Sequence, residues 1–229
     1  MTAVPTRDRI IEAAAALLAE GGREAVSTRA VGAAAGVQAP TIYRLFGDKQ
    51  GLLDAVAGHA FAGYVRSKSA LARTADPVDD LRRGWDLHVG FGLAHPAFYA
   101  LVYGEPRPGV ETPAAREAAA ILAGQVRRIA EAGRLRVSEE RAAHLIHAAG
   151  SGMTFTLIAL PPEQRDPALS VLAREAVLAA VTTDAPTPTD AGLVGHAVAL
   201  RAALPEAKVL TEPERGLLAE WLDRIATAD

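Results

Sequence analysis

Apolar residues recur at helical spacing from the start of the chain. The first predicted helix runs from about Thr6 to Glu20. Its apolar stripe consists of Ile10, Ala14, Leu17 and Leu18. Gly21-Gly22 should end this helix, because glycine adopts the left-handed conformation beyond a helix end without a steric penalty.

Turn and cap residues divide the next part of the chain into short helices. The pattern predicts helices over about 28–35 and 39–46, followed by a longer one from 49 past 64. Ser27 and Asp48 are suited to cap the first and last of these, since their side-chain oxygens can accept hydrogen bonds from unpaired amides. Pro40 is tolerated in a first turn, where its missing N–H has no helical partner. The sequence therefore predicts a compact head of short helices.

Longer helical patterns follow from about residue 78. They are expected over 78–93, 97–103, 113–132, 138–160, 167–182, 191–204 and 212–226, with a loop over 104–113 and a linker over 183–190. We predict an all-α protein with three parts. These are a three-helix head at 1–55, a larger helical body at 56–183, and a C-terminal helical extension at 184–229.

Composition supports a globular, helical chain. Half of the 229 residues are apolar, 22% are charged, and only 5% are aromatic. The sequence contains no cysteine, which excludes disulfides, thiolate metal sites and cysteine nucleophiles and fits a reducing compartment. No stretch approaches the roughly 20 unbroken apolar residues of a membrane span, and the N-terminus does not resemble a signal peptide. A cytoplasmic location without membrane association is expected.

The charges of the chain are nearly balanced. The whole chain has a formal net charge of −3, and residues 1–55 hold six basic and six acidic side chains. Because the head has no basic excess, affinity for nucleic acid must depend on where the bases lie.

Residues Ser27 to Leu53, STRAVGAAAGVQAPTIYRLFGDKQGLL, contain the functional motif. Ala30, Val31 and Ala34 are expected to give the second helix a small apolar face that lets the third approach closely. Gly36 should form the turn, with Val37 filling the gap between the helices. The expected buried side of the third helix comprises Ile42, Leu45 and Phe46.

The opposite side of that third helix has the side chains that a major-groove reader needs. Gln38 is suited to pair with adenine, Thr41 and Ala39 to contact a thymine methyl, and Arg44 to reach guanine or phosphate. Residues at the starts of neighbouring helices are placed to hold phosphates. The predicted DNA-binding residues are Thr28, Arg29, Gln38, Ala39, Pro40, Thr41, Tyr43, Arg44 and Lys49.

This stretch resembles the tetracycline-repressor (TetR) family over about residues 7–58. The resemblance lies in a combination of pieces: Thr28, Ala35-Gly36-Val37, Tyr43-Arg44-Leu45-Phe46, Lys49 and Leu52-Leu53. Two positions depart from the family pattern, Gln38 in place of a Ser or Thr cap and Pro40 in place of a small or basic residue, so base preference does not carry over. With this motif, residues 1–55 are predicted to be a DNA-binding domain. The resemblance implies that the body at 56–183 is a ligand-binding and dimerisation domain, which binds a small-molecule inducer and forms a homodimer through its last long helices, here 138–160 and 167–182.

Aromatic and histidine residues of the body are the candidate inducer contacts, since a pocket needs apolar walls with a few polar groups. They are Trp85, His88, Phe91, Phe98, Tyr99, Tyr103, His144, His147 and Phe155. Each of them can instead be an ordinary core residue. His144 and His147 share a helix face, but no third metal ligand is evident, so neither a metal nor a cofactor is predicted.

Enzyme motifs are absent from the sequence. There is no phosphate loop, dinucleotide fingerprint or HExxH, and Gly150-Ser151-Gly152 is not a nucleophile elbow. Asp79-Asp80 and Glu139-Glu140 are interpreted as helix-start charges.

The leading hypothesis is a homodimeric repressor that a small-molecule ligand releases from a palindromic double-stranded operator. The alternative is an all-α binding or scaffold protein that has lost DNA reading. No recognisable motif identifies the inducer, the operator sequence or the regulated genes. The sequence also does not distinguish a repressor from an activator.

Overall fold

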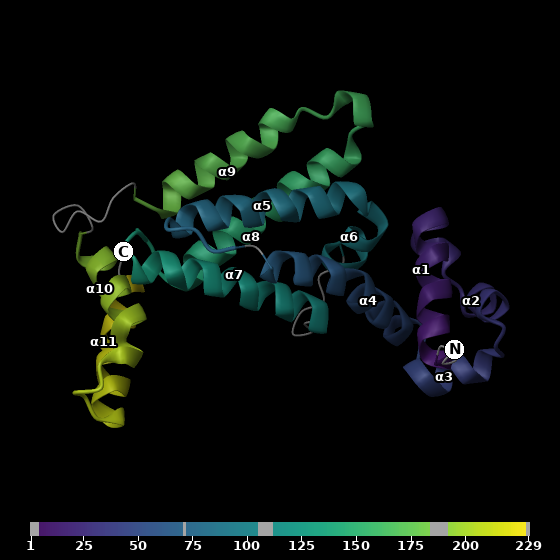
Figure 1. The fold of residues 1–229 in the computed structure, drawn as a ribbon, viewed down its shortest axis with the longest axis horizontal. Helices are drawn as coiled ribbons and strands as arrows, with labels where there is room; N and C mark the ends of the chain where they lie inside the picture. The colour runs from purple at the N-terminus through teal and green to yellow at the C-terminus, as the bar shows by residue number, and fades with distance from the viewer. Residues whose placement is uncertain (1–4, 71, 105–111, 184–191, 228–229) are drawn as a thin grey trace. The chain divides into compact units, whose positions relative to one another are not determined.

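The computed structural model describes residues 5–70, 72–104, 112–183 and 192–227, and within these residues the chain is helical throughout (Figure 1). The helices are α1 (Thr6–Ala25), α2 (Thr28–Ala35), α3 (Ala39–Phe46), α4 (Lys49–Ser69), α5 (Pro77–Ala94), α6 (Pro96–Tyr103), α7 (Pro113–Glu131), α8 (Glu139–Ala159), α9 (Pro167–Val181), α10 (Gly192–Ala203) and α11 (Glu212–Thr227). Two short 3-10 turns, Pro162–Gln164 and Leu204–Glu206, complete the set. The predicted all-α class is confirmed.

The predicted caps of α2 and α4 are present, but α1 continues beyond the glycine pair that was expected to end it. Gly22 has φ +65° and interrupts the helical geometry inside α1, after which the chain is helical again to Ala25. Ser27 caps α2 by accepting a hydrogen bond from the Ala30 amide at 3.1 Å, and Asp48 caps α4 through the Gly51 amide at 2.7 Å. Much of the predicted loop at 104–113 and nearly all of the linker at 183–190 lie outside the described residues.

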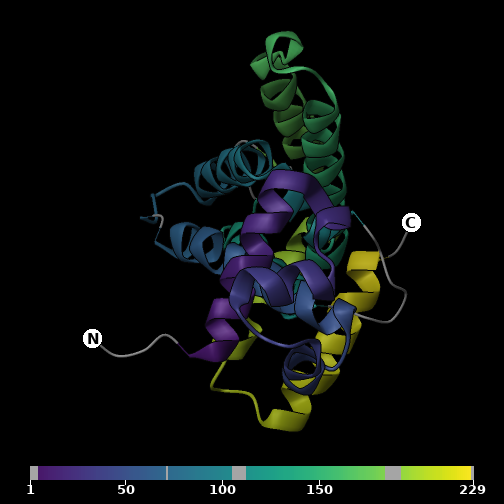
Figure 2. The same ribbon diagram turned by 90° about the vertical axis from the view of Figure 1, so that its right-hand side faces the viewer.

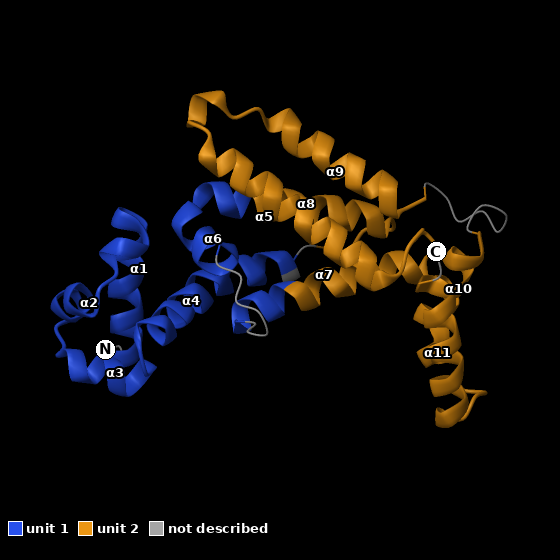
Figure 3. Ribbon diagram, turned by 180° about the vertical axis from the view of Figure 1, so that it is seen from behind, with its two compact units in different colours: residues 1–70, 90–118 blue, residues 71–89, 119–229 orange. Residues whose placement is uncertain are grey.

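The chain forms two compact units (Figure 3). Unit 1 consists of residues 1–70 and 90–118, and unit 2 consists of residues 71–89 and 119–229. Two helices pass from one unit to the other, since α5 and α7 each contribute residues to both. The predicted head, residues 1–55, lies entirely in unit 1.

Helices α1 to α4 are the purple and blue helices nearest the N-terminus in Figure 2, and they supply most of the core of the head. Its fully or almost fully buried members are Ile10, Ile11, Ala14, Leu18, Val26, Val31, Ile42, Leu52, Leu53 and Val56. Helix α6 packs against the same core through Ala97, Phe98 and Leu101, although it lies more than thirty residues beyond the head along the chain. The head core therefore depends on a helix from outside residues 1–55.

A buried carboxylate organises unit 2. Asp80, in the first turn of α5, is only 6% exposed and forms ion pairs with Arg83 and with Arg128 of α7. It also accepts hydrogen bonds from the amide and the hydroxyl of Thr74, each at 2.8 Å. Burial alone would raise the pKa of Asp80, but these hydrogen bonds outweigh it and hold the pKa well below its ordinary value. Asp80 is thus more than the helix-start charge expected from the sequence, and it ties α5 to α7.

Helix α9 packs along α8 (Figure 1) and is joined to α5 by polar contacts. The Trp85 indole N–H donates to the Ser170 hydroxyl at 3.0 Å, and Arg82 donates to the Glu175 carboxylate at 2.9 Å. The C-terminal hairpin of α10 and α11 is held to the rest of unit 2 at its helix ends. Arg127 of α7 donates to the Ala202 carbonyl at 3.1 Å, where the last carbonyls of α10 have no helical partner.

Candidate nucleic-acid interface

The turn between α2 and α3 depends on two glycines. Gly36 ends α2 in the left-handed conformation at φ +65°, as predicted. The Val37 amide then donates to the Gly32 carbonyl at 2.9 Å. A Cβ atom at position 32 would lie only 2.9 Å from the Val37 carbonyl oxygen, so this close approach requires glycine.

Gly32 provides the close approach between α2 and the chain leading into α3 that was expected from the alanines of α2. Val31 and Gly32 are buried, whereas Ala34 is exposed and does not belong to the packed face. The expectation for Ala34 was wrong because α2 is only eight residues long, and a one-residue rotation of its face cannot be distinguished from so few apolar positions.

Helix α3 has one buried side and one exposed side, as predicted. Ile42 is fully buried, and Leu45 and Phe46 are half-buried against the head core. On the other side, Tyr43 is 49% exposed and Arg44 is exposed. The polar side of the helix is therefore turned away from the core, where DNA can reach it.

Gln38 occupies the N-cap position of α3 but its side chain forms no capping hydrogen bond. Pro40 lies in the first turn, as predicted. Because the Gln38 amide is exposed and is not used to cap the helix, its donor and acceptor remain available for a base edge. All nine predicted DNA-binding residues are exposed or half-buried.

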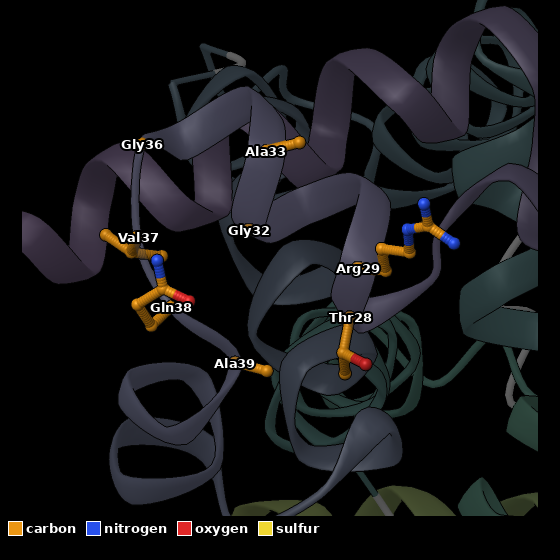
Figure 4. A pocket seen from close by; sticks show the side chains of 8 residues that line it. All are labelled: Thr28, Arg29, Gly32, Ala33, Gly36, Val37, Gln38 and Ala39. Atoms are coloured by element: carbon orange, nitrogen blue, oxygen red, sulfur yellow. The ribbon is translucent and has the colours of Figure 1, made fainter.

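A surface pocket of about 440 Å³ lies between α2 and the start of α3 (Figure 4). Four of the predicted DNA-binding residues line it: Thr28, Arg29, Gln38 and Ala39. The remaining lining residues, Gly32, Ala33, Gly36 and Val37, are small or apolar, and the sequence did not point to them as contacts. A small, concave surface beside exposed polar groups suits close approach of a nucleic-acid backbone or a base methyl group.

The six bases of the head divide into two groups. Arg7 lies over the Phe46 ring at 5.3 Å, Arg9 donates to the Ala35 carbonyl at 3.2 Å, and Arg23 donates to Gln50 at 3.1 Å. These three bases contact the head itself.

The other three bases, Arg29, Arg44 and Lys49, are all exposed, and none forms an ion pair within the described residues. They belong to α2, α3 and the start of α4, the elements that form the turn. The neutral charge of the head therefore conceals an exposed set of unpaired cations on the side expected to meet phosphates.

The candidate inducer residues are divided between the two units. Phe91, Tyr99 and Tyr103 lie together in unit 1, where they join Phe61 and Tyr64 of α4. Phe98 packs instead against the head core. Phe61 and Tyr64 were not predicted from the sequence, because they lie in the helix that follows directly on the head, and only packing brings them to α5 and α6.

The remaining candidates lie in unit 2. The Trp85 and His88 rings flank Gly150 of α8, where a Cβ atom would lie 3.4 Å and 3.7 Å from them. His144 and His147 are on the exposed side of α8, and Phe155 is half-buried. No group of three or more metal-ligating side chains occurs among the residues that the structure describes. None of the described helices is both long and apolar enough to cross a membrane.

A tight glycine turn, a short helix buried on one side, and a polar exposed side define a helix-turn-helix DNA-binding protein. Residues 10–56 match the family model of the bacterial regulatory proteins of the tetR family. This part of the chain therefore has the DNA-binding domain of that family.

Solved structures have the same fold. A bacterial regulatory protein of the tetR family from Rhodococcus RHA1 is 20% identical, with a TM-score of 0.59 over 80% of this chain and 100% of that one. A protein of unknown function from Rhodococcus sp. RHA1 is 19% identical, with a TM-score of 0.66 over 79% and 97%. The fatty acid degradation regulator FadR from Bacillus halodurans is 20% identical, with a TM-score of 0.57 over 78% and 97%. Curated protein sequences gave no significant match. About a fifth of this chain has no counterpart in these three structures.

Proposed function

We propose that the protein is a homodimeric repressor that binds a palindromic DNA operator and is released from it by a small-molecule ligand. The observation that carries the DNA-binding part is the exposed side of α3, with Tyr43 and Arg44 facing away from a core that Ile42 anchors. We assign the nine residues from Thr28 to Lys49 predicted above to the operator interface. The boundaries of the head, the body and the extension at residues 55 and 183 belong to the same proposal. DNA binding implies a cytoplasmic protein.

The two sides of α6 have different contacts, and this arrangement supports ligand control. One side of this eight-residue helix packs against the head core through Ala97, Phe98 and Leu101. The other side contributes Tyr99 and Tyr103 to the aromatic group with Phe61. A molecule that binds among these rings with different affinity in two states would shift α6 and, with it, the packing of α1.

Exposed apolar residues on α8 and α9 support a dimer. Leu145 is 48% exposed, Val171 46% and Leu172 69%, so each of these helices has large apolar side chains that a second subunit would cover. One short recognition helix contacts too few base pairs for useful specificity, so a two-fold dimer that presents two heads is expected. The proposed interface consists of α8 and α9.

Binding to DNA around the gene of the protein tests the proposal. Fluorescence anisotropy with the promoter fragment should give specific binding that the double variant Tyr43→Ala/Arg44→Ala loses by at least a hundredfold. Both side chains are exposed, so this variant should keep the circular dichroism spectrum and the dimer mass of the parent. The matched control replaces two other exposed residues, Glu163→Ala/Lys208→Ala, and should bind as the parent does.

A scaffold without DNA reading is the competing function, and the neutral charge of residues 1–55 favours it. In that case the parent would show only weak, sequence-independent binding, and the α3 substitutions would change nothing. Operator binding that is unaffected by Tyr43→Ala/Arg44→Ala would equally contradict the assigned interface.

A further inference from the structure

Five aromatic side chains of unit 1 pack into one group, here called the aromatic cluster: Phe61, Tyr64, Phe91, Tyr99 and Tyr103. The centroid of the Tyr64 ring lies 4.7 Å from that of Phe61 and 4.8 Å from that of Phe91. The Tyr99 and Tyr103 rings are also 4.8 Å apart. In a chain with only 5% aromatic residues, this is a marked concentration of flat apolar surface.

The aromatic cluster is not buried uniformly. Phe61 and Tyr99 are at most 1% exposed and Tyr64 is 5% exposed, so these rings form its base. Phe91 and Tyr103 are half-buried, and they bring the cluster to the surface of unit 1. An apolar molecule can therefore contact the rings of Phe91 and Tyr103 without unfolding the base.

Lys68 lies one helical turn after Tyr64 on α4, and its ammonium is 5.6 Å from the centre of the Tyr64 ring. Its side chain is half-buried, and no carboxylate among the described residues pairs with it. Burial lowers the pKa of the Lys68 amine to about 8. Lysines usually extend their ammonium into water, so an amine held over a ring without an anionic partner is an unusual arrangement.

The charge of the site indicates the class of ligand. Lys68 places an ammonium against a ring of the aromatic cluster, and the imidazole of His95 lies 5.3 Å from the Phe91 ring. One ammonium beside a large apolar surface matches a singly charged carboxylate with an apolar body better than it matches a phosphate. A phosphate carries more charge and is usually bound by several donors.

We propose that Lys68 and the aromatic cluster form an effector site for an amphipathic carboxylate, with the carboxylate on Lys68 and the apolar body against Phe91 and Tyr103. This inference rests on the proposed ligand control and names the chemistry of the ligand. Helix α4 connects the site to DNA binding directly, because it contributes Leu52, Leu53 and Val56 to the head core and Phe61, Tyr64 and Lys68 to the site.

Three probes with straight alkyl chains of matched length and different head groups test the proposal. They are dodecanoate, 1-dodecanol and dodecyltrimethylammonium, each used below its micelle-forming concentration in isothermal titration calorimetry with the full-length protein at pH 7. The short aromatic acid 4-phenylbutanoate is added to vary the apolar body. At least one of the two carboxylates should bind. If dodecanoate is the one that binds, its affinity should be at least tenfold higher than that of the alcohol or the cation.

Substitutions of Lys68 test whether this residue binds the carboxylate. Lys68→Met keeps the length and apolar character of the side chain but removes the charge, so it should lose at least tenfold in carboxylate affinity and leave binding of the alcohol unchanged. Lys68→Arg should retain carboxylate binding, and Lys208→Met, at an exposed lysine of unit 2, should match the parent. Circular dichroism and melting curves establish that each variant is folded.

The results separate this inference from the proposed function. Equal affinity for all three head groups, no binding of either carboxylate, or full carboxylate binding by Lys68→Met would each overturn the inference, even if operator binding is normal. Carboxylate binding that depends on Lys68 but does not release operator DNA would support the site and contradict the ligand-relieved repressor.

Discussion

Gly32 and the carbonyl of Val37 are in such close contact that a Cβ atom at position 32 would lie 2.9 Å from the carbonyl oxygen. The Val37 amide donates to the Gly32 carbonyl at 2.9 Å, so the end of α2 and the turn into α3 are joined through their backbones. The orientation of the exposed side of α3 therefore depends on the absence of a side chain one helical turn before Gly36.

Gly32→Ala should lower the free energy of unfolding by about 1–3 kcal/mol, because backbone atoms rather than a flexible side chain must move to admit the methyl group. It should also weaken operator binding, since any shift of Val37 alters where α3 begins. Thermal melting and DNA titration measure the two effects.

Gly58→Ala is the matched control for that variant. Gly58 lies inside α4, and a Cβ atom there would have no neighbour within 4 Å. The substitution should be neutral or stabilise the protein by about 0.5–1 kcal/mol, since alanine favours a helix more than glycine does. Equal melting temperatures for the two variants would contradict the steric role of Gly32.

Asp80→Asn should destabilise the protein by about 3 kcal/mol, because it leaves Arg128 and Arg83 without their shared carboxylate in a partly buried site. The neighbouring substitution Asp79→Asn provides the comparison. The Asp79 side chain is 53% exposed, and its partner Arg82 also binds Glu175, so a loss of less than about 1 kcal/mol is expected. Denaturant titrations at pH 7 measure the difference.

The stabilisation from Asp80 should depend on pH. Its pKa is lower in the folded protein than in the unfolded chain, where the ordinary value is 3.8. The unfolded chain then binds more protons near that value, so the contribution is complete above about pH 5 and is lost as the pH falls below 4. The gap in stability between the parent and Asp80→Asn should narrow from pH 6 to pH 3. A constant gap over this range would show that the charge of Asp80 is not what stabilises unit 2.

Lys68 should show a pH dependence in an alkaline window, because its amine has a lower pKa in the folded protein, about 8, than the ordinary 10.5. The unfolded chain binds more protons between these values, so the stability of the parent should rise with pH across that window. Removing the charge in Lys68→Met should stabilise the ligand-free protein at pH 7 by about 1–2 kcal/mol, since burying an unpaired ammonium is unfavourable. A less stable variant would indicate that Lys68 has a structural partner.

Operator affinity should fall steeply with salt. Lys49, exposed at the start of α4, is expected to hold a phosphate in each subunit. Lys49→Ala should reduce the slope of log K against log salt concentration by about 1 for each phosphate that it leaves without a cation, or about 2 for a dimer, and weaken binding to all sequences alike. An unchanged slope would remove Lys49 from the interface. Lys208→Ala should leave the slope as it is in the parent.

Much of the head follows from local sequence. Ser27, Gly36 and Asp48 act within one helical turn of their own positions, so a single sequence is enough to place the ends of α2 and the start of α4. The exposed side of α3 is predictable for the same reason, since Ile42 and Arg44 are two residues apart and lie on opposite sides of this short helix.

The sequence by itself determined the helices, their caps and the exposed polar side of α3, because these depend on spacing and on hydrogen bonds between near neighbours. Only the tertiary structure decided that Gly32 is the point of close approach, that Asp80 is a buried partner of Arg128, and that Phe61, Tyr64 and Lys68 belong with Phe91 and Tyr103. Most of these relationships join residues that are far apart in the chain. Gly32 lies among alanines of the same helix and differs from Ala33 and Ala34 in being buried. Periodicity shows which side of a helix is apolar, whereas the partner it packs against is determined by the packing of the whole unit.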